Sequence, residues 1–215
     1  SDAMAEMARV SERKGQSEEA MRWLLRARDV SDRKDMRWNL ALMDLHLSQG
    51  KPQQALEEGK IALAKQPTDL TTQLLYARAQ LALGDAAGAR GTLGSATRVA
   101  DFNAPQQTEI ARLQLAANNV DGAAYSLSKA LNGQPGFIPA EALMVEVERR
   151  QGATDKAEAR ARQIVQRQPN KALGHSLLGD LAMARKNTTG AIAAYRQAHK
   201  VEPGTGTTLT LMNTL

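Results

Sequence analysis

The stretch from residue 172 to residue 203 reads Ala172-Leu-Gly-His-Ser-Leu-Leu-Gly-Asp-Leu-Ala-Met-Ala-Arg-Lys-Asn-Thr-Thr-Gly-Ala-Ile-Ala-Ala-Tyr-Arg-Gln-Ala-His-Lys-Val-Glu-Pro203 and contains two helical patterns in succession. The first pattern has apolar or small residues at i, i+3, i+4 and i+7, one face of a 3.6-residue period: Gly174, Leu177, Leu178 and Leu181. The second pattern has them at i, i+4 and i+7: Ala191, Tyr195 and Ala198.

A turn separates the two patterns. The segment 187–190, Asn-Thr-Thr-Gly, supplies turn and N-cap residues, and Pro203 ends the second pattern. The stretch therefore predicts a hairpin of two helices, with small residues where the two backbones come close.

The hairpin pattern recurs along the chain every 34 residues, with one extra residue between the first two copies. Such a unit cannot bury both of its apolar stripes alone, so recurrence predicts stacked repeats. One column contains only alanine: Ala20, Ala55, Ala89, Ala123, Ala157 and Ala191. A second column is alanine in five of six copies: Ala27, Ala62, Ala96, Ala130, Ile164 and Ala198.

Two further columns mark the ends of the helices. The turn before each second helix contains Gly15, Gly50, Gly84, Asn118, Gly152 and Lys186. Glycine and asparagine accept the left-handed conformation that ends a helix. The closing column contains Asp32, Pro67, Asp101, Pro135, Pro169 and Pro203.

These columns resemble the tetratricopeptide repeat, whose motif has a small residue at position 8, Gly at 15, Ala at 20, a bulky residue at 24, Ala at 27 and Pro at 32. The resemblance implies an all-α fold, a right-handed superhelical solenoid of helix-turn-helix repeats. It divides a single array, 1–215, into repeats 1–35, 36–69, 70–103, 104–137, 138–171 and 172–205, and residues 206–215 fit the first helix of a further or truncated repeat.

The resemblance is looser at two positions. Position 24 is small in two repeats, at Gly59 and Ala161, which predicts thinner packing there. Position 8 is large in two repeats, at Met43 and Val145.

Composition agrees with a repeat array and argues against catalysis. The chain is 42% hydrophobic but only 3% aromatic, and a solenoid that needs only neighbour contacts can pack with small residues. There is no cysteine, which excludes disulfides and thiolate chemistry. The three histidines, His46, His175 and His199, have no metal-ligand spacing. We therefore expect no enzymatic activity, no catalytic residue, no cofactor and no metal.

The resemblance also implies a binding surface, because positions 2, 5, 9 and 12 of the first helices line a concave groove in this family. Position 9 is charged in all six repeats: Arg9, Asp44, Arg78, Arg112, Glu146 and Asp180. Position 12 contains Glu12, Leu47, Leu81, Leu115, Arg149 and Met183. The predicted partner-binding groove comprises Asp44, Arg78, Leu81, Arg112, Leu115, Glu146 and Arg149.

Two interpretations of this groove stay open. Arginines and leucines at its middle suit an extended protein or peptide segment with an apolar residue and a carboxylate. Alternatively, neighbouring charges pair with one another, Asp44 with Arg78 and Arg112 with Glu146, and only solubilise the surface. The carboxylate clamp of chaperone-binding relatives is absent, because no position 9 is asparagine.

The charged first helix of repeat 1 is typical of a water-exposed end, and Trp23 and Trp38 are interpreted as packing residues.

Positive charge is concentrated in residues 149–171, which contain seven cations and two carboxylates. The cations of the second helix predict a basic outer face at Lys156, Arg160, Arg162 and Arg167. An anionic polymer, a membrane surface or an acidic partner fits such a face. Nucleic acid is disfavoured, because almost no aromatic residues accompany the cations for base stacking.

Residues 206–215 form an apolar pattern whose second helix is missing. Leu209 and Met212 would normally face that helix, and the pattern also includes Leu211 and Leu215. Either the array continues or this edge pairs with another molecule, so we expect weak self-association, a homodimer through Leu209 and Met212.

The sequence thus predicts a non-enzymatic scaffold for protein–protein interaction. The alanine- and glutamine-rich repeats resemble bacterial repeat proteins of envelope and exopolysaccharide systems, including the lipoproteins found beside PEP-CTERM protein-sorting genes. That resemblance favours a periplasmic or outer-membrane-associated location over a cytoplasmic one. The rival hypothesis is a regulatory or substrate-recruiting segment of a larger enzyme, such as a glycosyltransferase.

Overall fold

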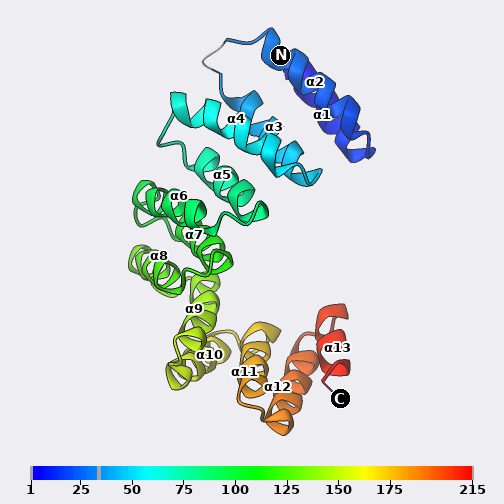
Figure 1. The fold of residues 1–215 in the computed structure, drawn as a ribbon. Coiled ribbons are helices and arrows are strands. Elements are labelled where there is room, and N and C mark those ends of the chain that lie inside the picture. Colours follow the sequence, from blue (N-terminus) through cyan, green and yellow to red (C-terminus); the bar gives the residue numbers. More distant parts are fainter. Residues whose placement is uncertain (1, 33–34, 215) are drawn as a thin grey trace. The chain divides into compact units, whose positions relative to one another are not determined.

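The structure, a computed structural model, describes residues 2–32 and 35–214. The ends of the predicted array at residues 1 and 215, and the predicted apolar Leu215, lie outside these ranges. The described residues form thirteen α-helices and no strand (Figure 1). The helices are α1 (Asp2–Arg13), α2 (Ser17–Asp29), α3 (Arg37–Ser48), α4 (Pro52–Lys65), α5 (Leu70–Ala82), α6 (Ala86–Val99), α7 (Ala104–Ala116), α8 (Val120–Gly133), α9 (Ile138–Arg150), α10 (Thr154–Arg167), α11 (Ala172–Ala184), α12 (Thr188–Val201) and α13 (Thr205–Met212).

The helices belong to two units. The N-terminal unit contains the residues up to Asp101 together with Ala116–Asn119, and the C-terminal unit contains Phe102–Leu115 and the residues from Val120 onward. Within the N-terminal unit, α1 packs on α2, α3 on α4 and α5 on α6. Within the C-terminal unit, α9 packs on α10, α11 on α12 and α13 on α12 (Figure 1). The all-α array of helix hairpins confirms the predicted fold class.

The two alanine columns form the contact between the helices of each hairpin. Every member of the first column, from Ala20 to Ala191, is fully buried, and the second column, including Ile164, is buried too. Their short side chains let two helices approach closely, and the larger apolar residues fill the space around them. In the N-terminal unit, for example, Ala8, Ala20 and Ala27 share a core with Leu24 and Trp38.

The predicted turn column is also present in the structure. All six residues between the paired helices have positive φ, and these include Asn118 (φ 52°) and Lys186 (φ 59°) as well as four glycines. At the predicted N-cap of α12, the Asn187 side chain accepts a hydrogen bond of 2.9 Å from the backbone N–H of Gly190.

Positions 8 and 24 of a repeat compensate for each other in size. Met43 occupies position 8 opposite Gly59, and Met43 and Tyr76 fill the place where a Gly59 side chain would be. The last repeat reverses the arrangement, because Gly179 lies under the ring of Tyr195. The packing at Gly59 is therefore dense rather than thin, since large neighbours supply the missing volume.

The ring of Tyr195 has little freedom to move. It is buried, and its hydroxyl donates a 2.7 Å hydrogen bond to Asp180 Oδ1. Burial of the ring and this hydrogen bond to a carboxylate raise the pKa of Tyr195 well above its usual value. A methyl group at Gly179 would lie 2.3 Å from a ring carbon of Tyr195, so the ring would have to shift.

Two Gly→Ala substitutions within helices should therefore have opposite effects. Gly91 of α6 has open space where a side chain would begin, so Gly91→Ala should raise the free energy of unfolding by about 0.5–1 kcal/mol through helix propensity. Gly179→Ala should lower it by about 1–3 kcal/mol, because overpacking outweighs that gain. Urea denaturation followed by circular dichroism measures both. Stabilisation by both substitutions would contradict the close contact at Tyr195.

Candidate partner-binding surface

The first helix of each repeat keeps one charged column on its surface. Arg9, Asp44, Arg78, Arg112 and Asp180 are exposed and Glu146 is half-buried, although the preceding residue is buried in every repeat. One side of these helices thus packs in the core while the next residue remains available to solvent. We call these six residues and their neighbours at position 12 the position-9 face.

The apolar part of the predicted groove is smaller than expected. Leu81 of α5 is half-buried, but Leu115 of α7 is only 8% exposed and belongs to a core cluster with Ala104, Ala111 and Ala123. The small alanines leave room for the Leu115 side chain to pack between the helices. We therefore assign Leu115 to the core rather than to the binding surface.

Charged residues on the position-9 face of the C-terminal unit have partners on their own helices. Arg112 forms an ion pair with Glu109, three residues earlier on α7. Glu146 accepts hydrogen bonds from Arg149 (2.7 Å) and Arg150 (2.6 Å) on α9. The predicted alternative, a pairing of Arg112 with Glu146 between repeats, is replaced by these contacts within each helix.

The arginines lower the pKa of Glu146. The hydrogen bond from Arg149 is the largest cause, the bond from Arg150 adds to it, and partial burial opposes both. The same contact raises the pKa of Arg149.

Arg78 and Arg112 belong to different units, and each is exposed within its own unit.

The predicted basic outer face needs correction. Arg160 lies against α9, where its guanidinium contacts the buried Glu148 at 2.7 Å, and Arg167 pairs with the buried Glu141 of the same helix. A buried carboxylate needs a charged or hydrogen-bonding partner. Helix α10 supplies one arginine to each of the two buried carboxylates of α9. These two arginines therefore hold a hairpin together rather than form an open basic surface.

The other two residues of that prediction are exposed. Arg162 pairs with Glu158 along α10, and Glu158 also forms a 2.7 Å ion pair with Arg185, the residue that follows α11. Lys156 is exposed to solvent. The surplus positive charge of residues 149–171 is thus largely engaged by carboxylates on neighbouring turns and helices.

A cavity of about 410 Å³ lies between α1 and α3 in the N-terminal unit. Its apolar surface comes from three alanines, a leucine and a tryptophan, and its rim from three carboxylates and two arginines. The lining residues are Asp2, Ala5, Ala8, Arg9, Glu12, Leu24, Arg37, Trp38, Ala41 and Asp44.

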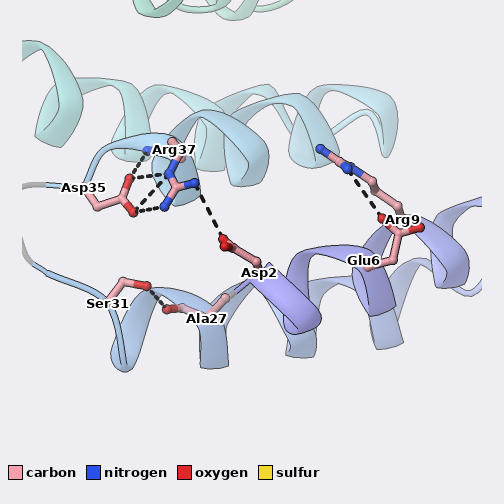
Figure 2. A network of polar contacts seen from close by, with 7 residues as sticks. All are labelled: Asp2, Glu6, Arg9, Ala27, Ser31, Asp35 and Arg37. Atoms are coloured by element: carbon pink, nitrogen blue, oxygen red, sulfur yellow. Dashed lines mark hydrogen bonds and ion pairs between the residues drawn. The ribbon is translucent and has the colours of Figure 1, made fainter.

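Both arginines at this cavity are already engaged, as Figure 2 shows. Arg37 donates to Asp35 through Nε and Nη2, at 3.0 and 2.8 Å, and its Nη1 lies 3.6 Å from Asp2. The bond from Arg37 lowers the pKa of Asp35. Arg9 pairs with Glu6 on the same helix at 3.5 Å.

Sequence reasoning missed this cavity, although its signal was present. Asp2, Ala5, Arg9 and Glu12 occupy positions 2, 5, 9 and 12 of repeat 1, the columns assigned to the groove. The charged character of that helix, by itself, is typical of a water-exposed end. A helix that packs through Ala8 needs little apolar area, so its charges can border a cavity.

The residues predicted for self-association lie on α13. Leu209 is 54% exposed and Met212 is 65% exposed, while α13 packs on α12. The side chain of His199 on α12 is 3.2 Å from the Thr207 hydroxyl of α13. The helix is therefore attached to repeat 6 and still presents two large apolar side chains to solvent.

Within residues 2–32 and 35–214, no group of three or more His, Asp or Glu side chains is arranged to hold a metal ion. His46 is partly buried, and this burial lowers its pKa. None of the helices in the same ranges combines the length and apolar character of a membrane span.

Two family profiles match the chain, both described as tetratricopeptide repeat. They cover residues 46–113 and residues 143–202. No curated protein sequence matches the chain.

Solved structures with the same fold are similar along nearly the whole chain. PilW, described as a widely conserved type IV pilus biogenesis factor, is 18% identical with a TM-score of 0.71, over 98% of this chain and 97% of its own. A tetratricopeptide repeat protein from Parabacteroides merdae is 16% identical with a TM-score of 0.66, over 99% and 98%. YrrB, described as a repeat protein with an unusual peptide-binding site, is 15% identical with a TM-score of 0.59, over 88% and 97%.

The contacts of Glu146 predict a pH dependence of stability. A carboxyl whose pKa is lower in the folded state stabilises the fold above its unfolded pKa, and this contribution is lost as the pH falls through the folded value. The unfolded pKa of glutamate is about 4.3, so the loss begins near pH 5 and continues below pH 4, roughly. The urea midpoint of Glu146→Gln should therefore fall less steeply with acidification than that of the wild type. Glu18→Gln, at an exposed carboxylate with no ion pair among the described residues, is the control. Identical slopes for Glu146→Gln and wild type would contradict the assignment.

Proposed function

The chain belongs to the tetratricopeptide repeat family, and from this premise we propose that it is a non-enzymatic scaffold that binds an extended segment of a partner protein through the position-9 face. Proteins with these repeats bind peptides or proteins, and YrrB is a structural neighbour for which a peptide-binding site is described. One observation carries the proposal. Charged residues recur at position 9 on the surface of each first helix, next to a position that is always buried.

The chemistry of this face favours binding. Some of its charges pair within single helices, as Arg112 does with Glu109, and pairs of this kind near the surface are worth only about 0–1 kcal/mol. A partner carboxylate can therefore compete with Glu109 for Arg112.

The finer proposal places the scaffold in a bacterial envelope, exopolysaccharide or protein-sorting system. It rests on the alanine- and glutamine-rich repeats, and a periplasmic or outer-membrane-associated location belongs to it. The rival function is recruitment of a substrate to an enzyme of which this array is one segment. The length of the native protein and its neighbouring genes distinguish the two: an appended catalytic domain supports the rival.

Arg78 of the N-terminal unit and Arg112 of the C-terminal unit are the residues that we propose for recognition of partner carboxylates, each within its own unit. Replacing both with alanine should weaken binding of a labelled peptide that contains leucine and aspartate by about tenfold or more, since each loses a charge-assisted hydrogen bond. Fluorescence anisotropy measures the affinity, and circular dichroism checks that helicity is unchanged. Arg22→Ala with Arg196→Ala, at exposed positions on the second helices α2 and α12, is the matched control. Equal affinity of the Arg78/Arg112 variant and wild type would refute the assignment.

The exposed side chains on α13 support a second proposed contact, weak self-association. Burial of the exposed part of Leu209 and Met212 against a second copy would contribute about 1–2 kcal/mol for each side chain, since 54% and 65% of these residues are exposed. The mass measured by light scattering should rise with protein concentration, and Leu209→Ser with Met212→Ser should return a monomer. Ile61→Ser, at an exposed apolar residue of α4, serves as control. A wild type that remains monomeric at all concentrations would exclude this contact.

A further inference from the structure

We propose that the cavity between α1 and α3 is a subsite for a cationic peptide segment, with an aliphatic side chain inserted between α1 and α3 and a flanking lysine or arginine at the rim. This inference rests on the proposed function, because it assigns a ligand chemistry to one part of the position-9 face. It differs from the recognition proposed at Arg78 and Arg112, where the partner contributes a carboxylate.

The floor of the cavity explains the aliphatic side chain. Ala5 and Ala41 are half-buried and too short to fill the space between the two helices, and the buried Ala8, Leu24 and Trp38 close its base. Its volume of about 410 Å³ lies within the usual range for small-molecule sites, roughly 300–1,000 Å³. A leucine-sized side chain therefore fits and would remove apolar surface from water.

The rim explains the positive charge. Arg9 and Arg37 face carboxylates of their own, Glu6 and Asp35, so their charges are balanced within the protein (Figure 2). Glu12 and Asp44 form no hydrogen bond or ion pair within residues 2–32 and 35–214. Two carboxylates from facing helices thus border the same cavity without an ion-pair partner of their own among the described residues.

The arrangement also disfavours an acidic ligand. An incoming carboxylate would meet Glu12, Asp44 and Asp2, while Arg37 is held by its bidentate contact with Asp35. Only the exposed Arg9, paired with Glu6 at 3.5 Å, could turn toward such a ligand. Such like-charge contacts cost affinity and slow association, whereas a lysine or arginine is attracted to the same rim. The cavity therefore discriminates between ligands by charge as well as by shape.

The experiment uses Trp38 as a local reporter. Trp23→Phe leaves Trp38 in the cavity wall as the single tryptophan. Three capped pentapeptides are titrated: one with leucine between two lysines, one with serine between two lysines, and one with leucine between two glutamates. We expect the lysine–leucine peptide to change the Trp38 emission and to bind at least about tenfold more tightly than the other two.

Variants at the rim and floor locate the contact. Glu12→Gln with Asp44→Asn should weaken the lysine–leucine peptide by about tenfold, and raising the salt concentration should have a similar effect, because the interaction is electrostatic. Ala41→Leu and, separately, Ala5→Leu fill the cavity and should prevent binding. Glu18→Gln with Glu57→Gln removes two exposed carboxylates outside the cavity and should leave the affinity unchanged.

Several results would overturn the proposal. These are equal binding of the glutamate–leucine peptide, unchanged affinity in the rim variant, binding that survives both floor variants, or no binding of any of the three peptides. None of these results would refute the proposed function, which is tested by the acidic peptide and the Arg78/Arg112 variant. If the Arg78/Arg112 variant binds the acidic peptide as the wild type does, while the lysine–leucine peptide binds at the cavity, the cavity alone is the peptide-binding part of the face.

Discussion

Close contact between the two helices of each hairpin is the constraint on which the rest of the structure depends. Ala20, Ala55 and their counterparts are fully buried, so the paired helices meet through methyl groups. Larger residues are admitted only where the opposite position is small, as Met43 is opposite Gly59 and Tyr195 is opposite Gly179. Only 3% of the residues in the chain are aromatic, so the packing density comes from the close approach of the helices rather than from large side chains.

Because the helices pack through small residues, charged side chains lie close to the contact between neighbouring helices. The buried carboxylates Glu141 and Glu148 of α9 are balanced by Arg167 and Arg160 of α10, so a region that is basic in sequence uses its cations to join two helices. Other charges pair along a single helix, as Glu146 does with Arg149. Glu12 and Asp44, which have no ion-pair partner among the described residues, lie on facing helices at one cavity, and it is this convergence that carries the proposed cationic subsite.

The fold was predictable from the sequence because its determinants are local and periodic. The alanine columns and the left-handed turn residues recur at a fixed spacing, and each of these features can be recognised from the sequence of a single repeat. Size compensation was only half visible: the sequence showed that Gly59 was small and Met43 large, but not that these residues face each other. The predicted thin packing was wrong for this reason.

The candidate site was less predictable, because it depends on contacts between side chains of different helices. Nothing in the local pattern reveals that Arg160 turns toward Glu148, or that Leu115 enters the core.

Binding of partners to the first helices of the repeats, rather than to the second, is the property on which both proposed sites depend. Amide chemical-shift mapping of the isotope-labelled protein during titration with its peptide ligands tests this property most directly. We expect the shifted amides to belong to α1, α3 and α5 in the N-terminal unit and to α7, α9 and α11 in the C-terminal unit. Shifts confined to α2, α4, α6, α8, α10 and α12 would contradict it.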